Sequence, residues 1–544
     1  MHRLSASLTI ATVFLCSVPS GLAAASGAAP ARSAIPGPAL VDFNGDGFAD
    51  LAIGVRGESV GFISGAGAVN ALYGSVRGLQ ARSPLNQLWT QDSPGVKDAA
   101  EAGDSFGSSM TTDDFNGDGF TDLAIGAVSE DVNAGAVNVL YGSFNGLQAT
   151  SPDDEFWTQD SPGVKDSSEG NDGFGSSLTS GDFDGDGYDD LAIGVPHEHL
   201  GAVGFAGAVN VLYGSAAGLQ AHSPDDQFWT QDSPGVEDAA ESNDQFGYSL
   251  TSGDFNTDGF ADLAAGVPFE DLVVNNNEGA ANVLYGSPGG LQTIAPAEQF
   301  WSQDSPGVKD TAEAYDYFGY AMTSGDFNSD GFADLAVGVP QEGVGTNFPS
   351  AGGVSVLYGS AVGLQADSPD DQVWSQGSPG VPGTLEEADE FGWSLAAQDF
   401  NGDGFPDLAV GVPDESLASV STREGAVNVL YGGPLGLQAT SPAAQFWTQD
   451  STGVQDEAEP LDDFGLAVGA GDWNGDGRAD LAVGVPHEDV ADNQTMFDEG
   501  AVNVLYGGPD GLQADSPDDQ LWTQDSRGVR DSSESEDLFG WALA

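Results

Sequence analysis

The stretch Phe174–Pro196, FGSSLTSGDFDGDGYDDLAIGVP, contains the motif that best indicates the fold of this 544-residue chain. It joins a Phe-Gly opening, an acidic loop at Asp182–Asp190 and an apolar segment at Leu191–Pro196. Short apolar runs that are rich in β-branched and aromatic residues and bounded by Gly, Asp or Pro are typical of β-strands. The stretch is therefore expected to form two strands joined by the acidic loop.

This pattern occurs seven times, and successive acidic loops start 68 to 73 residues apart. In each unit, two further apolar stretches follow, such as Gly207–Gly214 and Gln227–Asp232. Repeats of this length indicate a solenoid, an array or a propeller. Four short strands per unit favour a propeller. We therefore predict an all-β fold, a seven-bladed β-propeller with four-stranded antiparallel blades.

The two ends of the repeat region indicate how the ring closes. The first unit begins near residue 38 and has an acidic loop but no Phe-Gly opening, whereas the chain ends on a spare one, Phe539–Ala544. We expect this last strand to complete the first blade, because an unpaired sheet edge is an aggregation hazard. A truncation that happens to stop there is the alternative. An open solenoid would carry polar capping repeats at both ends, and none is visible.

The N-terminus has the pattern of a secretory signal over residues 1–25, followed by a linker over residues 26–37 and the propeller over residues 38–544. An apolar run from Leu8 to Val18 follows a short basic start, and Ala23–Ala25 offer a cleavage site. The sole cysteine, Cys16, lies inside this segment, so disulfides cannot stabilise the mature chain. We expect a secreted, extracellular protein without direct membrane insertion. Whether it is released or retained at the cell surface is left open.

The charge is strongly negative, with 85 acidic and 12 basic residues and a net charge of −73. Such a surface repels phosphate backbones, so nucleic acid is excluded as a partner. Divalent cations, cationic surfaces and neutral glycans fit better. Adaptation to high salt is an alternative source of the acidity.

The acidic loops have the oxygen donors of a calcium site. Positions one, three, five and nine carry Asp or Asn, position seven offers its carbonyl, and position six is a glycine that permits a sharp turn. In chain order the loops lie at residues 42–50, 114–122, 182–190, 254–262, 326–334, 399–407 and 472–480. The predicted ligands are Asp42, Asn44, Asp46, Phe48, Asp50; Asp114, Asn116, Asp118, Phe120, Asp122; Asp182, Asp184, Asp186, Tyr188, Asp190; Asp254, Asn256, Asp258, Phe260, Asp262; Asp326, Asn328, Asp330, Phe332, Asp334; Asp399, Asn401, Asp403, Phe405, Asp407; and Asp472, Asn474, Asp476, Arg478, Asp480.

These loops are not EF-hands, because position twelve is apolar in all seven and lies inside an expected strand rather than carrying a bidentate Glu. The competing interpretation is a turn whose Asp and Asn only satisfy their own backbone. Seven matching copies favour up to seven structural Ca²⁺ ions. With a Kd of about 0.1 mM and about 1 mM calcium, each ion would add roughly 1.4 kcal/mol.

From its Phe-Gly opening to its Gly-Val-Pro end, the stretch Phe174–Pro196 resembles the FG-GAP repeat of integrin α-subunit propellers. The resemblance covers the chain from about residue 38 onward. It implies a seven-bladed propeller with calcium in hairpin loops on one face and ligand contacts through the opposite face. In that family only some blades hold calcium, whereas all seven here carry the ligands. Gly126-Ala127-Val128 in the second unit lacks the final proline, which puts local strand geometry in doubt but not metal binding.

Two aromatic positions also repeat once per unit. A ring of tryptophans could bind sugars, but we favour a role in packing between blades, because Trp has a large apolar surface. The repeated tyrosines are interpreted as structural. The tryptophans are Trp89, Trp157, Trp229, Trp301, Trp374, Trp447 and Trp522, and the tyrosines are Tyr73, Tyr141, Tyr213, Tyr285, Tyr358, Tyr431 and Tyr506.

No nucleophile elbow, phosphate loop or paired-histidine zinc motif is present, so we predict no catalytic residues and no enzymatic activity. The connections after each Gly-Val-Pro differ between units, and loops on a rigid scaffold are where recognition usually lies. We expect a monomeric binding or adhesion scaffold whose ligand is an unidentified extracellular protein or glycan. A lectin-like propeller and a structural component of the cell surface or matrix are the alternatives.

Overall fold

The computed structural model describes residues 40–272, 276–345, 348–417, 422–490 and 497–544. The predicted signal segment and linker, residues 1–37, lie outside the described residues, and the fold described below is that of the unit Pro38–Ala544. In the part of the chain that is described, no helix is long and apolar enough to cross a membrane.

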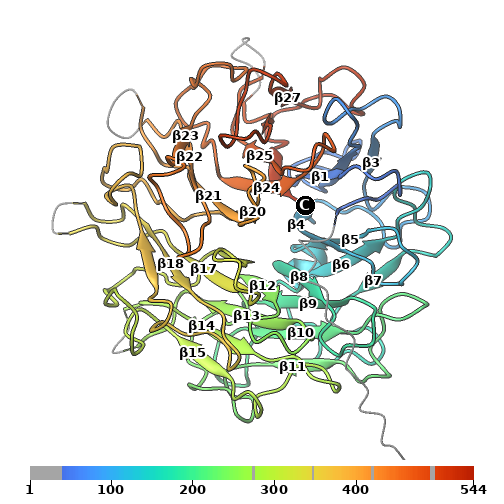
Figure 1. The fold of residues 1–544 in the computed structure, drawn as a ribbon. Coiled ribbons are helices and arrows are strands. Elements are labelled where there is room, and N and C mark those ends of the chain that lie inside the picture. The colour runs from blue at the N-terminus through green and yellow to red at the C-terminus, as the bar shows by residue number, and fades with distance from the viewer. Residues whose placement is uncertain (1–39, 273–275, 346–347, 418–421, 491–496) are drawn as a thin grey trace, which may run out of the picture. The chain divides into compact units, whose positions relative to one another are not determined.

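Within this unit, seven four-stranded antiparallel sheets are arranged around a central axis (Figure 1). This confirms the predicted all-β, seven-bladed propeller. The innermost strands are β28 (Phe539–Leu543), β4 (Phe106–Asp113), β8 (Ser177–Gly181), β12 (Leu250–Gly253), β16 (Met322–Gly325), β20 (Leu395–Gln398) and β24 (Ala467–Gly471). The second strands are β1 (Leu51–Val55), β5 (Asp122–Ala127), β9 (Asp190–Val195), β13 (Asp262–Val267), β17 (Asp334–Val339), β21 (Asp407–Val412) and β25 (Asp480–Val485).

The two outer positions of each blade hold the Val-Asn-Val-Leu and Trp segments of the repeat. The third strands are β2 (Ala68–Leu72), β6 (Ala136–Leu140), β10 (Ala208–Leu212), β14 (Ala280–Leu284), β18 (Gly353–Leu357), β22 (Ala426–Leu430) and β26 (Ala501–Leu505). The outermost strands are β3 (Gln87–Trp89), β7 (Glu155–Trp157), β11 (Gln227–Trp229), β15 (Gln299–Trp301), β19 (Gln372–Trp374), β23 (Gln445–Trp447) and β27 (Gln520–Trp522). One turn, α1 (Glu130–Asn133), is assigned as helix, but Asp131 and Val132 in it have positive φ, so it is not a regular right-handed helix.

The ring closes as predicted. The last strand, β28, pairs antiparallel with β1, so the first blade has the order β28-β1-β2-β3. Val55 lies opposite Phe539, and the Ala52 N–H donates to the Ala544 carbonyl at 2.8 Å. The first and last repeat units therefore share one sheet.

Glycines of the repeat allow successive blades to approach each other closely. A Cβ on Gly194 in β9 would lie 2.2 Å from the carbonyl oxygen of Gly247, the glycine of the next Phe-Gly opening. The corresponding distance is 2.1 to 2.4 Å at all seven blade boundaries. A side chain at this position would push the blades apart, which is why both motifs carry glycine.

Apolar clusters fill the space between neighbouring blades. In one of them, Val209 and Tyr213 of the third blade and the buried Phe246 pack against Leu263 and Val267 of the fourth blade. Each repeated tryptophan packs against such a cluster, and the repeated tyrosines are at most 1% exposed. The packing role predicted for both aromatic positions is confirmed.

Antiparallel strands give the ring two different faces. Six acidic loops join first to second strands, and the first loop leads into β1 at the same end, so all seven lie at one end of the blades, here called the hairpin face. The variable connections from second to third strands, and the connections from one blade to the next, lie at the other end, here called the connection face. The connections that follow Gly-Val-Pro and differ between units thus share the face opposite the acidic loops, as far as their residues are described.

Candidate metal centres

The aspartate at loop position one holds the turn together. In the first loop, one Asp42 carboxylate oxygen accepts hydrogen bonds from the Gly45 and Asp46 amides at 2.6 and 3.2 Å. The other oxygen accepts from the Gly47 amide at 2.8 Å. The backbone of the loop is thus wrapped around this carboxylate, and the glycine at position six has φ +89° at Gly47, a conformation that disfavours other residues.

The aspartate at position nine is held in place by two backbone amides. Asp190 is fully buried at the start of β9, where its carboxylate accepts from the Phe183 amide at 2.9 Å and from the Gly214 amide at 2.8 Å. Burial, together with the nearby charges of Asp184 and Asp182, raises the pKa of Asp190 to about 8. The same causes raise the pKa of Asp50 and of Asp262 to about 8. An uncompensated buried carboxylate is costly, and a bound cation would compensate it.

The structure brings positions one, three and nine together. In the third loop, carboxylate oxygens of Asp182, Asp184 and Asp190 all lie within 4.8 Å of one another. In the first loop, the Asn44 amide nitrogen lies 3.2 Å from an oxygen of Asp50. The carboxylate and amide side chains of these loops offer oxygen donors, which fits calcium better than a nitrogen- or sulfur-seeking metal.

Positions five and seven lie at the outer side of each loop. Asp46 is exposed, and one of its carboxylate oxygens accepts from the Phe48 amide at 3.1 Å. The side chain at position seven has a role that the sequence did not reveal. A Cβ on Gly45 would lie 2.7 Å from the ring of Phe120, so this ring covers the loop of the preceding blade.

The loops are also linked to each other by backbone. The Thr121 amide donates to the Asp42 carbonyl at 3.1 Å, and the Ala49 amide donates to the Asp472 carbonyl at 3.2 Å across the ring closure. Pro406 stands at this position in the sixth loop and has no N–H to donate. These backbone hydrogen bonds fix the position of each linked loop relative to its neighbour.

The seventh loop differs because position seven is an arginine. The Arg478 guanidinium lies 3.6 Å from an Asp476 carboxylate oxygen, and its Nε donates to the Asn401 carbonyl at 3.3 Å. A fixed positive charge beside a ligand opposes the binding of a cation. We therefore expect this loop to bind calcium more weakly than the other six.

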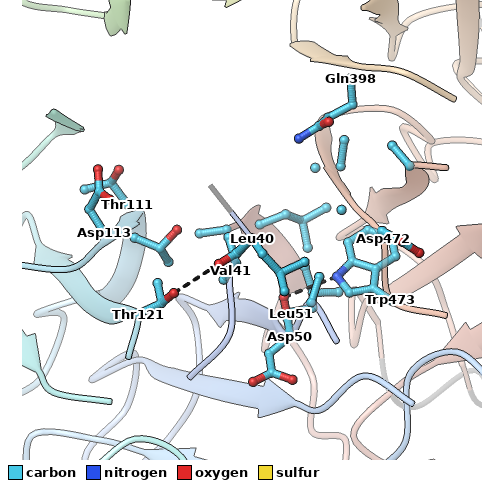
Figure 2. Close-up of a pocket in the computed structure, with 18 of the residues that line it drawn as sticks. Leu40, Val41, Asp50, Leu51, Thr111, Asp113, Thr121, Gln398, Asp472 and Trp473 are labelled. Carbon is cyan, nitrogen blue, oxygen red and sulfur yellow. Dashed lines mark hydrogen bonds between the residues drawn. The ribbon is translucent and has the colours of Figure 1, made fainter. Parts of the chain in front are cut away.

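A cavity lies near the inner ends of several blades, and its wall combines predicted loop residues such as Asp50 and Asp472 with residues that the sequence did not single out (Figure 2). Its wall includes Trp473, whose indole N–H donates to the Asp50 carbonyl at 3.2 Å, and Thr121, whose hydroxyl donates to the Leu40 carbonyl at 3.2 Å. Asp113 also lines it, and its charge together with burial raises the pKa of Asp189 to about 9. No repeat-level pattern in the sequence could indicate this cavity, because its wall combines residues from several units.

A row of aromatic rings lies on the connection face. The rings of Tyr248, Tyr320 and Trp393 follow the Phe-Gly openings of three successive blades, with centroids 5.1 and 4.7 Å apart. Phe269, from a variable connection, contacts Tyr248 at 5.6 Å and Tyr317 at 5.1 Å. These rings are the surface residues that sequence reasoning missed, because they do not repeat in every unit.

Comparison with known proteins identifies the repeat. The FG-GAP repeat matches residues 36–69, 106–140, 174–212, 246–284, 318–357, 391–430 and 464–502. Phosphatidylinositol-glycan-specific phospholipase D from Bos taurus is 34% identical over 197 residues, which are 36% of this chain and 21% of that protein. Integrin alpha-PS2 from Drosophila melanogaster is 30% identical over 281 residues, which are 50% of this chain and 17% of that protein.

The matched region is thus about a fifth of the length of these relatives. Among solved structures, the exotype rhamnogalacturonan lyase YesX is 13% identical with a TM-score of 0.38, over 81% of this chain and 68% of that one. With seven repeat matches and seven blades in the same places, the chain belongs to the FG-GAP repeat proteins and forms an integrin-like propeller.

Proposed function

We propose that this chain is a secreted, calcium-stabilised binding scaffold without enzymatic activity. The observation that carries the calcium part is the ring of buried position-nine carboxylates. Each has a raised pKa and is surrounded by oxygen donors, as at Asp50, Asp190 and Asp262. Seven such sites on one face would hold the hairpins of a chain that has no cysteine after its signal segment.

The residues that would hold each ion are those at loop positions one, three, five and nine, with the carbonyl of position seven. Calcium would supply the positive charge that these loops lack. The protein's own part is to fix the donors: position one organises the turn through backbone amides, and position nine is anchored to the neighbouring hairpin at Gly214.

We propose that the ligand binds the connection face over the aromatic row. Tyr248, Tyr320 and Trp393 are only partly buried and form a continuous set of rings beside the variable connections. Flat aromatic surfaces with polar edges are enriched in recognition sites. A protein or neutral glycan fits this surface, whereas the net charge of −73 disfavours nucleic acid. The row supports the lectin-like alternative more than the repeated tryptophans do, because those are used in packing.

The proposal of a non-enzymatic role rests on the site chemistry. The relatives whose names denote enzymes align with this chain over about 200 residues, a fifth of their length. Their activities therefore do not transfer to this chain.

The test compares ligand capture by the wild-type chain with Tyr320→Ala and Trp393→Ala variants, on a glycan array and against extracellular matrix proteins. Phe62→Ala is the matched control, since Phe62 is a fully exposed aromatic in another connection. We expect at least a tenfold loss of binding in the row variants and none in the control. Equal binding by all variants would contradict a ligand site on the row, and no ligand in either panel would favour the structural alternative.

A further inference from the structure

A second set of acidic residues repeats on the connection face, away from the hairpin loops. The connection entering six of the seven blades carries Asp-x-x-Glu-x-x-Asp before the Phe-Gly opening, as in Asp531, Glu534 and Asp537. A glutamate that follows each second strand faces this connection and is at most 5% exposed. These glutamates are Glu58, Glu130, Glu198, Glu270, Glu342, Glu415 and Glu488.

The two elements meet at the blade boundaries. Between the seventh and first blades, carboxylate oxygens of Glu58, Glu534 and Asp537 all lie within 4.8 Å of one another. Three further boundaries hold a related cluster, in which the first aspartate of the motif takes the place of the last. They are formed by Asp98, Glu101 and Glu130; by Asp166, Glu169 and Glu198; and by Asp238, Glu241 and Glu270.

Buried oxygen atoms without a hydrogen-bond partner accompany these carboxylates. The Gln524 amide nitrogen donates to Glu58, but the oxygen on the same amide carbon has no partner. Asp537 accepts from the Glu534 amide through one oxygen, while its other oxygen has no partner. Both side chains are 1% exposed. The orphan amide oxygen recurs at all seven boundaries, on Gln91, Gln159, Gln231, Gln303, Gln376, Gln449 and Gln524.

Buried polar atoms in proteins nearly always have a partner, so a sevenfold repetition of one orphan oxygen needs an explanation. A proton on Glu58 could satisfy the Gln524 oxygen, but it would leave the Asp537 oxygen unpaired. Among the described residues, no lysine or arginine forms an ion pair with these three carboxylates. All these oxygens could coordinate a single hard cation, because calcium takes six to eight oxygen ligands.

We propose that each blade boundary with the full Asp-x-x-Glu-x-x-Asp motif binds a divalent cation of the calcium type on the connection face. This cation holds one blade to the next. The buried glutamate and the acids of the entering connection supply its carboxylates, and the glutamine supplies an amide oxygen. These sites do not depend on the hairpin loops, which lie at the opposite ends of the blades. The boundary between the fifth and sixth blades has Gly383 in place of the first aspartate, and we expect the weakest binding there.

The test is the crystal structure of the full chain grown with calcium chloride, with anomalous differences recorded at long wavelength. We expect a peak among Glu58, Glu534 and Asp537 within coordination distance of the Gln524 oxygen. The inference would be overturned if there is no peak at this position and Glu58 forms hydrogen bonds with both the oxygen and the nitrogen of the Gln524 side-chain amide. Peaks in the hairpin loops are judged separately, so the two sets of sites can fail independently.

Equilibrium dialysis measures the same sites in solution. Glu58→Gln and Glu534→Gln are each expected to bind about one calcium ion fewer than the wild-type chain. Glu534 is exposed, so its variant keeps the test valid if Glu58→Gln does not fold. Asp510→Asn, which removes an exposed charge outside both sets of sites, should bind as many ions as the wild type. An unchanged count in Glu534→Gln would also overturn the inference.

Discussion

Close approach of the blades at paired glycines leads to a specific prediction for Gly338→Ala. The added Cβ would lie 2.1 Å from the backbone carbonyl oxygen of Gly392 in the next blade, and an ordinary contact begins at 3.4 Å. About 1.3 Å of separation is therefore missing, and both sides are backbone, Gly338 within β17 and Gly392 in the turn that leads into β20. Overpacking of this kind costs about 1–3 kcal/mol, and we expect the upper end because no flexible side chain can move away.

The assay is thermal unfolding at fixed calcium. At about 2.1 cal/mol/K per residue, the unfolding entropy of the propeller unit is about 1 kcal/mol/K, so a loss of about 3 kcal/mol lowers the Tm by about 3 °C. Gly343→Ala is the matched control, because a Cβ there meets nothing within 4 Å and Gly343 has no positive φ. It should melt at or slightly above the wild-type temperature. Equal Tm values for the two variants would refute the reasoning.

Three further predictions concern stability. In excess EDTA, the free energy of unfolding should fall as the pH rises from about 4 to about 8. Burial raises the pKa of Asp50 in the folded chain from 3.8 to about 8, so protonation of Asp50 stabilises the fold and its ionisation at higher pH destabilises it. Urea denaturation that gives the same free energy of unfolding across this pH range would contradict the prediction. Asn210→Ala should cost about 1–3 kcal/mol, because the fully buried amide donates to the Lys165 carbonyl at 3.1 Å and its loss leaves that carbonyl unpaired; a change in urea midpoint too small to correspond to 1 kcal/mol would count against this. Trp229→Ala should destabilise the chain by about 3–5 kcal/mol through lost packing between blades, and a variant that melts like the wild type would show that the ring is not part of the core.

Much of the fold could be predicted because the repeat shows how many blades there are and how many strands each blade has. Seven Phe-Gly openings and seven acidic loops at regular spacing predicted the number of blades, and the spare opening at Phe539 predicted how the ring closes. The role of the paired glycines could not be predicted, because Gly194 and Gly247 meet only across a blade boundary. The spacing of Asp and Asn in each loop predicted which residues gather there, and the structure brings Asp182, Asp184 and Asp190 together.

What the sequence could not indicate are contacts between units and features that do not repeat. The Gln–Glu pairs at the boundaries join residues 39 positions apart in neighbouring blades, as between Gln159 and Glu198. The aromatic row exists because three successive blades carry Tyr248, Tyr320 and Trp393, whereas the neighbouring blades on either side have Ser176 and Leu466. The pattern that the seven units share therefore indicates neither the Gln–Glu pairs nor the aromatic row.

The direct measurement of the central claim is the Tm of the full chain in about 1 mM calcium and again in excess EDTA at the same pH and ionic strength. Six hairpin sites at about 1.4 kcal/mol each, with a smaller contribution from the seventh, contribute about 8–10 kcal/mol, which corresponds to a Tm about 8–10 °C lower in EDTA. Calcium restored in excess over EDTA should return the Tm to its first value. Superimposable melting curves in calcium and EDTA would contradict the claim that divalent ions in the hairpin loops stabilise this propeller.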